Sequence, residues 1–342
     1  MLLNSLNGIF LHKHRLQILT ERECEQLDDD FLNGRAIYLC VQMMTPSLLK
    51  KRDIRYKMNS ACRKKLAMLS HIGAAARMYS FDDSLDYTLF AYYPAFWEEK
   101  IFHLPIFALG RLTKTFWGQL QVLVTLLRLR KSFETIVFYN ASYYFVLPLL
   151  IMKYLFHKKI IIDFEDDYSV RDDRYLNSIA QKVIVSHLDG AILVNTHLKA
   201  QIPIVVSTKV VNGFFDLSYL AALERKEYSE FRFIFSSSLD DLRGADLLEH
   251  FVLALKNEGF NFSLTITGYG PESDTIATLA GLHSNVAFEG FVSSERLSVL
   301  MDDANVGLVL QPRGSEFGRG SYPSKIQEYA EHKLPVLWFS ES

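Results

Sequence analysis

Cysteine is scarce in this chain and is not spaced to bind a metal. The three cysteines, Cys24, Cys40 and Cys62, are odd in number among 342 residues. A reducing, cytoplasmic compartment fits this pattern best. The ten histidines form no metal-ligand cluster either. A GxSxG elbow, a P-loop and a Cys/His pair are absent as well, which excludes the common hydrolytic constellations.

Long hydrophobic runs are also absent. The longest run, residues 143–152, is closed by Lys153 and has about half the length that crosses a bilayer. At the N-terminus, basic residues follow a short apolar run, which is the reverse of the order in a signal peptide. We therefore expect neither a transmembrane helix nor an export signal.

The chain has almost no net charge, because 37 Lys and Arg nearly balance 39 Asp and Glu. A hydrophobic fraction of 49% in 342 residues indicates a globular protein large enough for two domains. The charge is uneven, however: residues 1–190 hold 25 Lys and Arg against 20 Asp and Glu, and the remainder holds 12 against 19. The first half should therefore meet an anionic partner. Nucleic acid would need a more basic domain, so a membrane surface or a phosphate-bearing acceptor is favoured.

Apolar strand-like runs alternate with amphipathic helical runs along most of the chain, a pattern typical of parallel α/β domains. The expected strands are residues 35–42, 75–82, 134–140, 159–166 and 190–195 in the first half, and 231–236, 263–267, 286–288, 306–310 and 334–339 in the second. The expected helices are residues 60–71, 112–130, 141–156, 245–256 and 295–302. A charged segment, 216–230, separates the halves. We therefore predict domains at 1–216 and 217–342.

Residues 321–337, SYPSKIQEYAEHKLPVL, contain the most informative motif. Pro323 suits the first turn of a helix, which leaves the backbone amides of Ser324 and Lys325 at its positive end, where a phosphate can bind. Glu328 lies further along the same helix, where its carboxylate can accept hydrogen bonds from hydroxyl groups. An anion site and a hydroxyl-binding acid on one helix suit a sugar nucleotide.

This stretch resembles the donor-site motif of glycosyltransferase family 4, which runs roughly PxKxxEYxAxGxPV. Other elements of the family follow in the right order: the Asn212–Gly213 turn, SSSLDDLRGADLL at 236–248, ITGYGPE at 266–272 and the segment 285–306. The resemblance runs from Asp189 to Leu337. It implies a GT-B fold, in which two Rossmann-like domains face each other across a cleft. Family members normally continue for several tens of residues, so the second domain is expected to be truncated at its C-terminus.

The resemblance also implies roles for donor-site residues. Arg243 stands where the family usually has a Lys that contacts the diphosphate, although it could instead pair with a nearby Asp. Lys325 could add the positive charge that Ser238 does not supply, or could pair with Glu328 or Glu331. Glu328 corresponds to the acid that binds the ribose hydroxyls.

Four further donor-binding candidates come from turns and loops. Gly268 and Gly270 follow a strand, as a turn before a helix requires, and ordinary turn glycines would look the same. Val292 lies where the family binds the base through backbone groups. The first acid of the family's acid pair would fall at Gly320, so Glu316 is the nearest replacement. The glycines around it would allow close approach to a ligand.

Four acids within residues 163–167 lie at the end of the expected strand 159–166, at the edge where open α/β sheets bind ligands. Glu165 and Asp166 are the candidate catalytic residues, to orient or deprotonate an acceptor hydroxyl or to stabilise oxocarbenium-like charge. Many family members have a His near position 165, and this chain does not. Two alternatives are a magnesium site and capping of the following segment. The resemblance implies no cofactor and no metal.

Two basic segments predict binding to a membrane surface. Residues 50–65 hold eight Lys and Arg, and residues 111–131 hold five with no acid, interleaved with Phe116, Trp117 and several leucines. A basic amphipathic helix with aromatic residues suits an anionic bilayer, although a solvated helix packed on the sheet is the alternative. We expect a cytoplasmic protein, either free or peripheral on the inner face of the cytoplasmic membrane.

These observations predict a retaining, hexosyltransferase-type glycosyltransferase. It would move a sugar from a nucleotide sugar to a lipid-linked or glycan acceptor, in the synthesis of a bacterial capsule, O-antigen or exopolysaccharide. Two alternatives remain. One is a non-catalytic glycosyltransferase-like partner subunit, and the other is a GT-B sugar-nucleotide epimerase.

Overall fold

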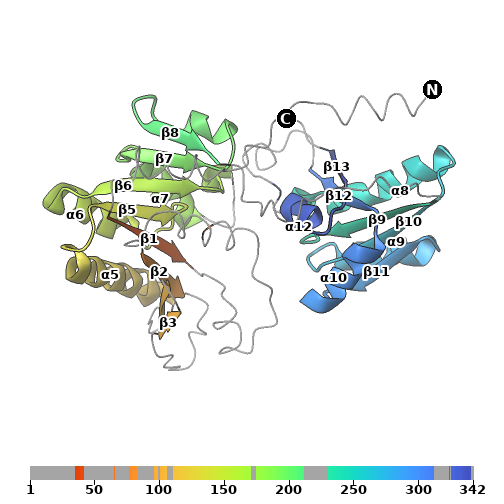
Figure 1. The fold of residues 1–342 in the computed structure, drawn as a ribbon, viewed down its shortest axis with the longest axis horizontal. Coiled ribbons are helices and arrows are strands. Elements are labelled where there is room, and N and C mark those ends of the chain that lie inside the picture. The colour runs from red at the N-terminus through yellow and green to blue at the C-terminus, as the bar shows by residue number, and fades with distance from the viewer. Residues whose placement is uncertain are drawn as a thin grey trace.

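A computed structural model describes residues 35–41, 65, 77–82, 96–98, 101–105, 111–170, 175–211, 230–311, 323 and 325–339. Its strands form two sheets, one built from residues before 211 and the other from residues after 230 (Figure 1). Helices lie beside each sheet, so both are α/β layers, as the sequence predicts. The predicted domain boundary at 216/217 lies outside the described residues.

The first sheet has eight strands in the order β3-β4-β2-β1-β5-β6-β7-β8, and only β3 runs antiparallel to its neighbour. The strands are β1 (Ala36–Val41), β2 (Arg77–Asp82), β3 (Phe96–Glu98), β4 (Ile101–Pro105), β5 (Thr135–Tyr139), β6 (Lys159–Phe164), β7 (Gly190–Leu193) and β8 (Ser207–Val210). Strands β1, β5, β6 and β7 are buried along almost their whole length. Near-continuous apolar runs are expected of parallel strands covered on both faces.

One face of this sheet is covered by the helices α5 (Arg111–Leu129), α6 (Val146–Phe156) and α7 (Tyr175–Val185). Short 3₁₀ turns, η2 (Tyr168–Val170) and η4 (His197–Gln201), follow β6 and β7. The core joins Val122 and Leu126 of α5 and Leu149 and Met152 of α6 to the strand residues Phe138 and Ile162. Helix α6 ends at a left-handed residue, His157 (φ 54°), whose N–H donates to the Met152 carbonyl.

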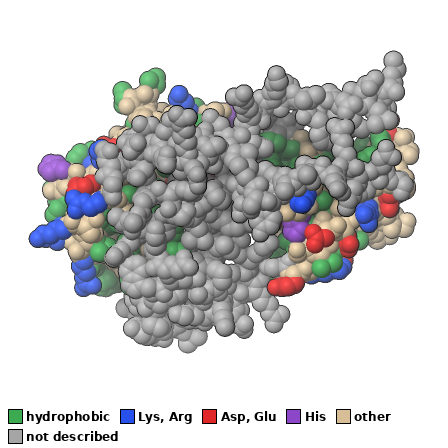
Figure 2. All heavy atoms as spheres, in the orientation of Figure 1, with side chains coloured by type: hydrophobic (Ala, Val, Ile, Leu, Met, Phe, Trp, Pro, Cys, Tyr) green, Lys and Arg blue, Asp and Glu red, His purple; other side chains and the backbone are tan. Residues whose placement is uncertain are grey.

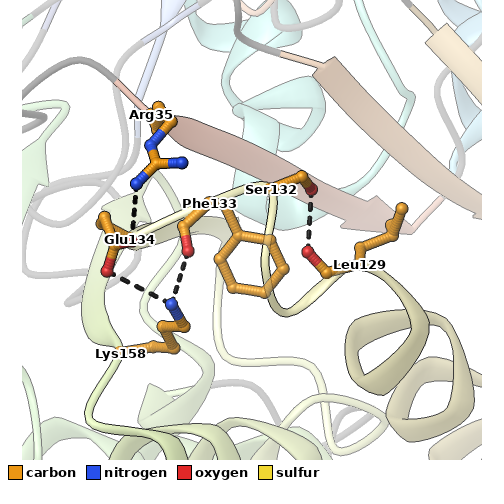
Figure 3. Close-up of polar contacts among 6 residues, drawn as sticks. All are labelled: Arg35, Leu129, Ser132, Phe133, Glu134 and Lys158. Atoms are coloured by element: carbon orange, nitrogen blue, oxygen red, sulfur yellow. Dashed lines mark hydrogen bonds and ion pairs between the residues drawn. The ribbon is translucent and has the colours of Figure 1, made fainter.

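An ion-pair cluster connects the N-terminal ends of three central strands (Figure 3). Glu134 accepts from Arg35 at 3.0 Å and from Lys158 at 3.2 Å. The Lys158 ammonium also donates to the Phe133 carbonyl at 2.7 Å. Arg35, Glu134 and Lys158 directly precede or adjoin β1, β5 and β6, so one carboxylate connects the starts of these strands.

The second sheet has five parallel strands in the order β11-β10-β9-β12-β13. They are β9 (Phe231–Ser236), β10 (Phe262–Thr267), β11 (Val286–Gly290), β12 (Val306–Leu310) and β13 (Val336–Phe339). The helical segments are η6 (Asp241–Arg243), η7 (Ala245–Leu247), α8 (Leu248–Asn257), α9 (Ser273–Leu282), α10 (Ser294–Asp303) and α12 (Lys325–Glu331). Helices α8 and α9 contribute to one core cluster of this lobe, and α10 and α12 contribute to another.

Most predicted elements are present, and several boundaries differ for local reasons. The predicted helix 141–156 begins only at Val146, because a turn follows Asn140, with Ser142 N–H bonded to the Asn140 carbonyl. The predicted strand 159–166 ends at Phe164. The predicted helix 245–256 opens as the 3₁₀ turn η7. The sequence reading missed β3, β4, β8 and α7, and it gave no bounds for the helix after Gly270, which is α9. Of the predicted helix 60–71, only Lys65 is among the described residues.

Candidate functional site

Strands β9 and β12 are adjacent in the second sheet but pair over only a short stretch, and a site that suits a ligand lies beside them. These strands pair only at Val306↔Phe233 and Gly307↔Ile234. The chain enters this sheet at β9, and later strands add to it on either side. The gap between β9 and β12 is therefore the topological switch point, beyond whose carboxyl edge open α/β sheets bind ligands.

Tyr329 of α12 inserts its hydroxyl where the two strands diverge. The hydroxyl accepts from the Ser236 N–H at 3.0 Å and lies 3.2 Å from the carbonyl oxygens of both Ile234 and Leu308, to which its proton can be donated. Gly307 makes room for the ring, because a Cβ there would lie 2.5 Å from two ring carbons. Burial raises the pKa of Tyr329. The neutral hydroxyl thus replaces the missing strand pairing and fastens α12 to the sheet.

Glu328 and Lys325 lie on the same short helix. Glu328 is only 6% exposed and accepts from the Lys325 ammonium at 2.8 Å. Of the two acids that the sequence allowed as partners for Lys325, the structure therefore pairs it with Glu328. A largely buried carboxylate with a single cationic partner keeps further acceptor capacity for hydroxyl groups.

Arg243 lies in the loop that follows β9. Asp240 caps the turn, because its Oδ1 accepts from the Arg243 backbone N–H at 2.9 Å. Gly244 comes next with φ 74°, and a Cβ there would meet the Cβ of Leu310 at 2.7 Å. Leu310 is the last residue of β12, so this contact holds the Arg243 turn against the carboxyl end of that strand. The side chain of Arg243 is half-buried.

Gly268 and Gly270 let the loop after β10 lie directly on the loop after β9. A Cβ on Gly268 would overlap the Ser237 carbonyl oxygen, and one on Gly270 would overlap that of Leu239. The two loops are also hydrogen-bonded, from Leu239 N–H to the Tyr269 carbonyl at 3.1 Å and from Glu272 N–H to the Leu239 carbonyl at 3.0 Å. Gly268 has φ 136°, a conformation that favours glycine. These glycines shape the carboxyl edge by close backbone packing.

The loop after β11 adjoins the same edge, since the Gly268 N–H donates to the Gly290 carbonyl at 2.9 Å. Val292 itself packs against the cluster that contains Leu300 and Tyr329. Each of these two loops carries an exposed aromatic residue: Tyr269, after β10, is 67% exposed, and Phe291, after β11, is 56% exposed. Their rings meet edge to face at 6.5 Å. Sequence reasoning missed this pair, although an aromatic residue beside a turn glycine was a usable signal. Glu316 and Ser324, the other two candidates, lie outside the described residues.

In the first sheet, the four acids of residues 163–167, at the end of β6 and just beyond it, divide into two groups. Asp163 is buried and accepts from the Tyr38 hydroxyl. Asp167 is also buried and accepts from the Ser169 hydroxyl at 2.6 Å and the Gln181 amide at 2.7 Å. These two acids therefore have structural hydrogen bonds, so only part of the acidic run 163–167 is left to face an acceptor. Glu165 and Asp166 are half-buried and remain the candidates.

Two residues at the end of β5 contact these remaining acids. The Tyr139 hydroxyl donates to Glu165 Oε2 at 3.0 Å. The Asn140 amide donates to Asp166 Oδ2 at 3.1 Å. Burial, and next the Glu165 carboxylate, raise the pKa of Tyr139. Sequence reasoning missed both residues, because nothing local predicts which side chains meet across neighbouring strands.

The described residues also bear on metal and membrane binding. Within the described ranges, no three His, Cys, Asp or Glu side chains converge to hold a metal ion. No helix formed by these residues combines the length and hydrophobicity needed to span a bilayer. On α5, Phe116 and Arg128 are exposed, as is Arg130 just after the helix, whereas Lys114 is only 5% exposed. Of the five basic residues in the segment 111–131, Lys114 is therefore too buried to face a membrane surface.

Comparisons with known proteins identify the fold. No protein-family profile matches the sequence, and no curated protein does. Among solved structures, Anabaena Alr3699/HepE in complex with UDP is 14% identical, with a TM-score of 0.55 over 89% of this chain and 80% of that one. The lipopolysaccharide outer core galactosyltransferase WaaB is 13% identical, with a TM-score of 0.52 over 88% and 79%. A Listeria monocytogenes structure described as a UDP-N-acetylglucosamine 2-epimerase is 12% identical, with a TM-score of 0.50 over 90% and 79%. The chain has the GT-B fold of glycosyltransferases.

Proposed function

We propose that this protein is a retaining glycosyltransferase that moves a sugar from a nucleotide sugar to an acceptor hydroxyl, in the synthesis of a bacterial surface polysaccharide. The observation that carries the proposal is the buried Glu328 carboxylate, paired with Lys325 at 2.8 Å, on a helix fastened at the switch point of a GT-B sheet. The UDP in the HepE structure supports a nucleotide diphosphate as part of the donor.

In the proposed donor complex, Glu328 accepts hydrogen bonds from the ribose hydroxyls. Arg243 and Lys325, with the backbone at Ser324, neutralise the departing diphosphate, which is the largest electrostatic demand of the reaction. The reaction then needs no resident metal, because these cations meet the developing charge. The backbone at Val292 and the packed loops at Gly268 and Gly270 border the base. Glu316 is the proposed second acid.

In this proposal the exposed rings of Tyr269 and Phe291 add a contact surface for the base. Both lie on loops at the same carboxyl edge as Arg243, and aromatic faces stack on nucleobases. On the acceptor side, Glu165 and Asp166 would orient the attacking hydroxyl and stabilise oxocarbenium-like charge. The acceptor would be a lipid-linked intermediate or a glycan.

A thermal-shift panel of UDP-, GDP- and ADP-linked sugars tests the donor site, because a ligand that binds only the folded state raises the melting temperature. Glu328→Ala and Arg243→Ala should each weaken binding by about 1–3 kcal/mol, the usual scale for hydrogen bonds to charged groups. Glu289→Ala is the matched control, since this glutamate also forms an ion pair in the same lobe, with Arg296 at 2.6 Å. Unchanged affinity in both test variants would rule this site out.

An epimerase is the second candidate, and the Listeria structure with the same fold supports it. An epimerase releases its product without an acceptor, whereas a transferase retains its donor until an acceptor hydroxyl attacks. Nucleotide release that rises at least tenfold on adding a lipid-linked or glycan acceptor supports transfer. Sugar isomerisation without any acceptor would support the epimerase instead.

We also propose that the first lobe binds peripherally to an anionic membrane at the cytoplasmic face. Helices α5, α6 and α7 contain no Asp or Glu, and Lys and Arg side chains are visible along the edge of the lobe formed by α5 and α6 (Figure 2). Large apolar side chains are exposed on all three helices, namely Phe116, Trp117, Leu147, Leu155, Leu176 and Ile179. Exposed cations beside exposed apolar residues suit a bilayer with anionic headgroups.

Liposome sedimentation tests the membrane proposal. Neutralising Arg128, Lys131 and Lys182 to Gln should reduce binding to anionic vesicles, and added salt should reduce it further. Lys256→Gln in the other lobe is the control and should bind normally. Equal binding of the wild type to neutral vesicles would contradict an electrostatic contribution.

A further inference from the structure

We propose that Tyr139 and Asn140 are positioning residues for the two acceptor-facing acids, Tyr139 acting on Glu165 and Asn140 on Asp166. The inference rests on the proposed function, because it concerns the geometry of those two carboxylates. It adds two consecutive residues to the proposed site, because the side chains of Tyr139 and Asn140 each donate to a different acid.

Tyr139 is held in place by contacts on both of its sides. It is the last residue of β5 and pairs with Asp163 of β6. Its hydroxyl donates to Glu165 Oε2 at 3.0 Å. The ammonium of the buried Lys65 lies 3.1 Å from the centroid of the ring, a cation–π contact that restrains the ring. A restrained donor of this kind favours one orientation of the Glu165 carboxylate.

Asn140 contacts the acid pair through both ends of its amide. Its Oδ1 accepts from the backbone N–H of Glu165 at 2.7 Å and of Asp166 at 3.1 Å. Its Nδ2 donates to Asp166 Oδ2 at 3.1 Å. The side chain is 1% exposed. Strand β6 ends at Phe164. Beyond it, the side-chain amide of Asn140 takes the place of strand pairing for Glu165 and Asp166, and it also orients the Asp166 carboxylate.

The backbone at position 140 explains why asparagine suits this place. Its φ is 48°, a left-handed conformation that Asn adopts more readily than most residues. Its own N–H donates to the Asp163 carbonyl at 2.9 Å, which fixes the turn against β6. Glycine would permit this φ but would contact neither acid. Aspartate would keep the acceptor but lose the N–H donor to Asp166.

Positioning of this kind affects the chemical step more than donor binding. Each of these adjacent carboxylates has its own side-chain donor, and a hydrogen bond to a charged acceptor favours one orientation of that acceptor. Reacting groups must approach within about 3–3.5 Å in the right orientation, so small displacements reduce turnover strongly. The residues that set this orientation should therefore change kcat and leave the KM for the donor unaltered.

Double-mutant cycles in the full chain test the proposal. Tyr139→Phe removes only a hydroxyl and is combined with Glu165→Gln. Asn140→Asp keeps the size and the acceptor and is combined with Asp166→Asn, which restores an N–H donor between the two positions. Tyr143→Phe is the matched control, because that hydroxyl donates to Tyr144 at 2.6 Å. Each variant is measured for kcat, donor KM and urea unfolding.

If the proposal holds, Tyr139→Phe lowers kcat about tenfold with donor KM unchanged. Tyr143→Phe also loses one hydroxyl hydrogen bond and lowers the unfolding midpoint by a similar amount, but it leaves kcat unchanged. In the Glu165→Gln background, Tyr139→Phe then causes no further loss. The exchanged pair Asn140→Asp/Asp166→Asn recovers the stability lost in Asn140→Asp but not its turnover.

Two results would overturn the proposal in distinguishable ways. If Tyr139→Phe loses the same factor with and without Glu165→Gln, Tyr139 does not act through that acid, although the proposed function stands. If Glu165→Gln and Asp166→Asn both transfer sugar at the wild-type rate, or if the wild type transfers none, the proposed role of the acids fails and the positioning role with it.

Discussion

Removing the Tyr329 hydroxyl should destabilise the second lobe far more than an ordinary Tyr→Phe change. In Tyr329→Phe, the Ser236 N–H loses its 3.0 Å partner, and the carbonyls of Ile234 and Leu308 lose a shared donor at 3.2 Å. An unsatisfied buried polar group costs about 1–3 kcal/mol. Because one N–H and one donated bond are lost, we expect a loss of about 2–4 kcal/mol in the free energy of unfolding.

Hydrogen exchange and urea unfolding together measure this loss. A loss of about 2 kcal/mol corresponds to roughly 30-fold less protection of the amides whose exchange requires opening of the lobe, and peptides covering β9 and β12 would report it. Tyr269→Phe is the control, since this tyrosine is 67% exposed and surface changes usually stay within about 0.5 kcal/mol. If Tyr329→Phe costs no more than Tyr269→Phe, the hydroxyl does not replace strand pairing, and this account of the switch point is wrong.

Three other predictions follow from the two lobes. Gly268→Ala should destabilise the second lobe by about 3 kcal/mol or more, because its Cβ would overlap the neighbouring loop and its φ is positive. Gly281 in helix α9 is the control, since a Cβ there meets nothing within 4 Å. Gly281→Ala should therefore be neutral or stabilising in thermal unfolding. Burial raises the pKa of Tyr329 above its usual 10.0. The stability contributed by the neutral hydroxyl is therefore complete below pH 10 and is lost as the pH rises further, because the tyrosine ionises first in the unfolded chain. In urea titrations above pH 10, the wild type should lose stability more steeply than Tyr329→Phe. Glu165→Gln and Asp166→Asn should slow transfer while donor affinity in thermal shift stays unchanged, and activity that a chelator abolishes and Mg²⁺ restores would instead favour a metal at these acids.

Local patterns in the sequence were enough for the strands and helices that carry strong periodicity. Buried runs such as those of β5, β6 and β9 are continuous in sequence, because both faces of a parallel sheet are covered. The start of α12 follows from Pro323 and the polar residues after it. By contrast, β3 and β8 have only three and four residues, too short for alternation to separate them from loops.

The four acids of residues 163–167, at the end of β6 and just beyond it, illustrate what local reasoning could not separate. All four look alike in sequence, yet Asp163 and Asp167 are buried in structural hydrogen bonds while Glu165 and Asp166 contact the end of β5. Which carboxylate turns inward depends on the partners that strand order brings near it. Tyr38 reaches Asp163 across 125 positions of the chain, a pairing that no local pattern contains.

The sequence by itself determined the α/β class, the GT-B resemblance and the position of Glu328 on a helix that begins just after a proline. These properties depend on side-chain periodicity, backbone preferences and motif order, all of which are local or additive along the chain. Only the tertiary structure decided that Tyr329 joins β9 to β12, that Gly268 lies under the Ser237 carbonyl and that Tyr139 and Asn140 contact the two acids. These contacts arise from strand register and from the divergence of strands at a switch point, which depend on every element of the sheet at once.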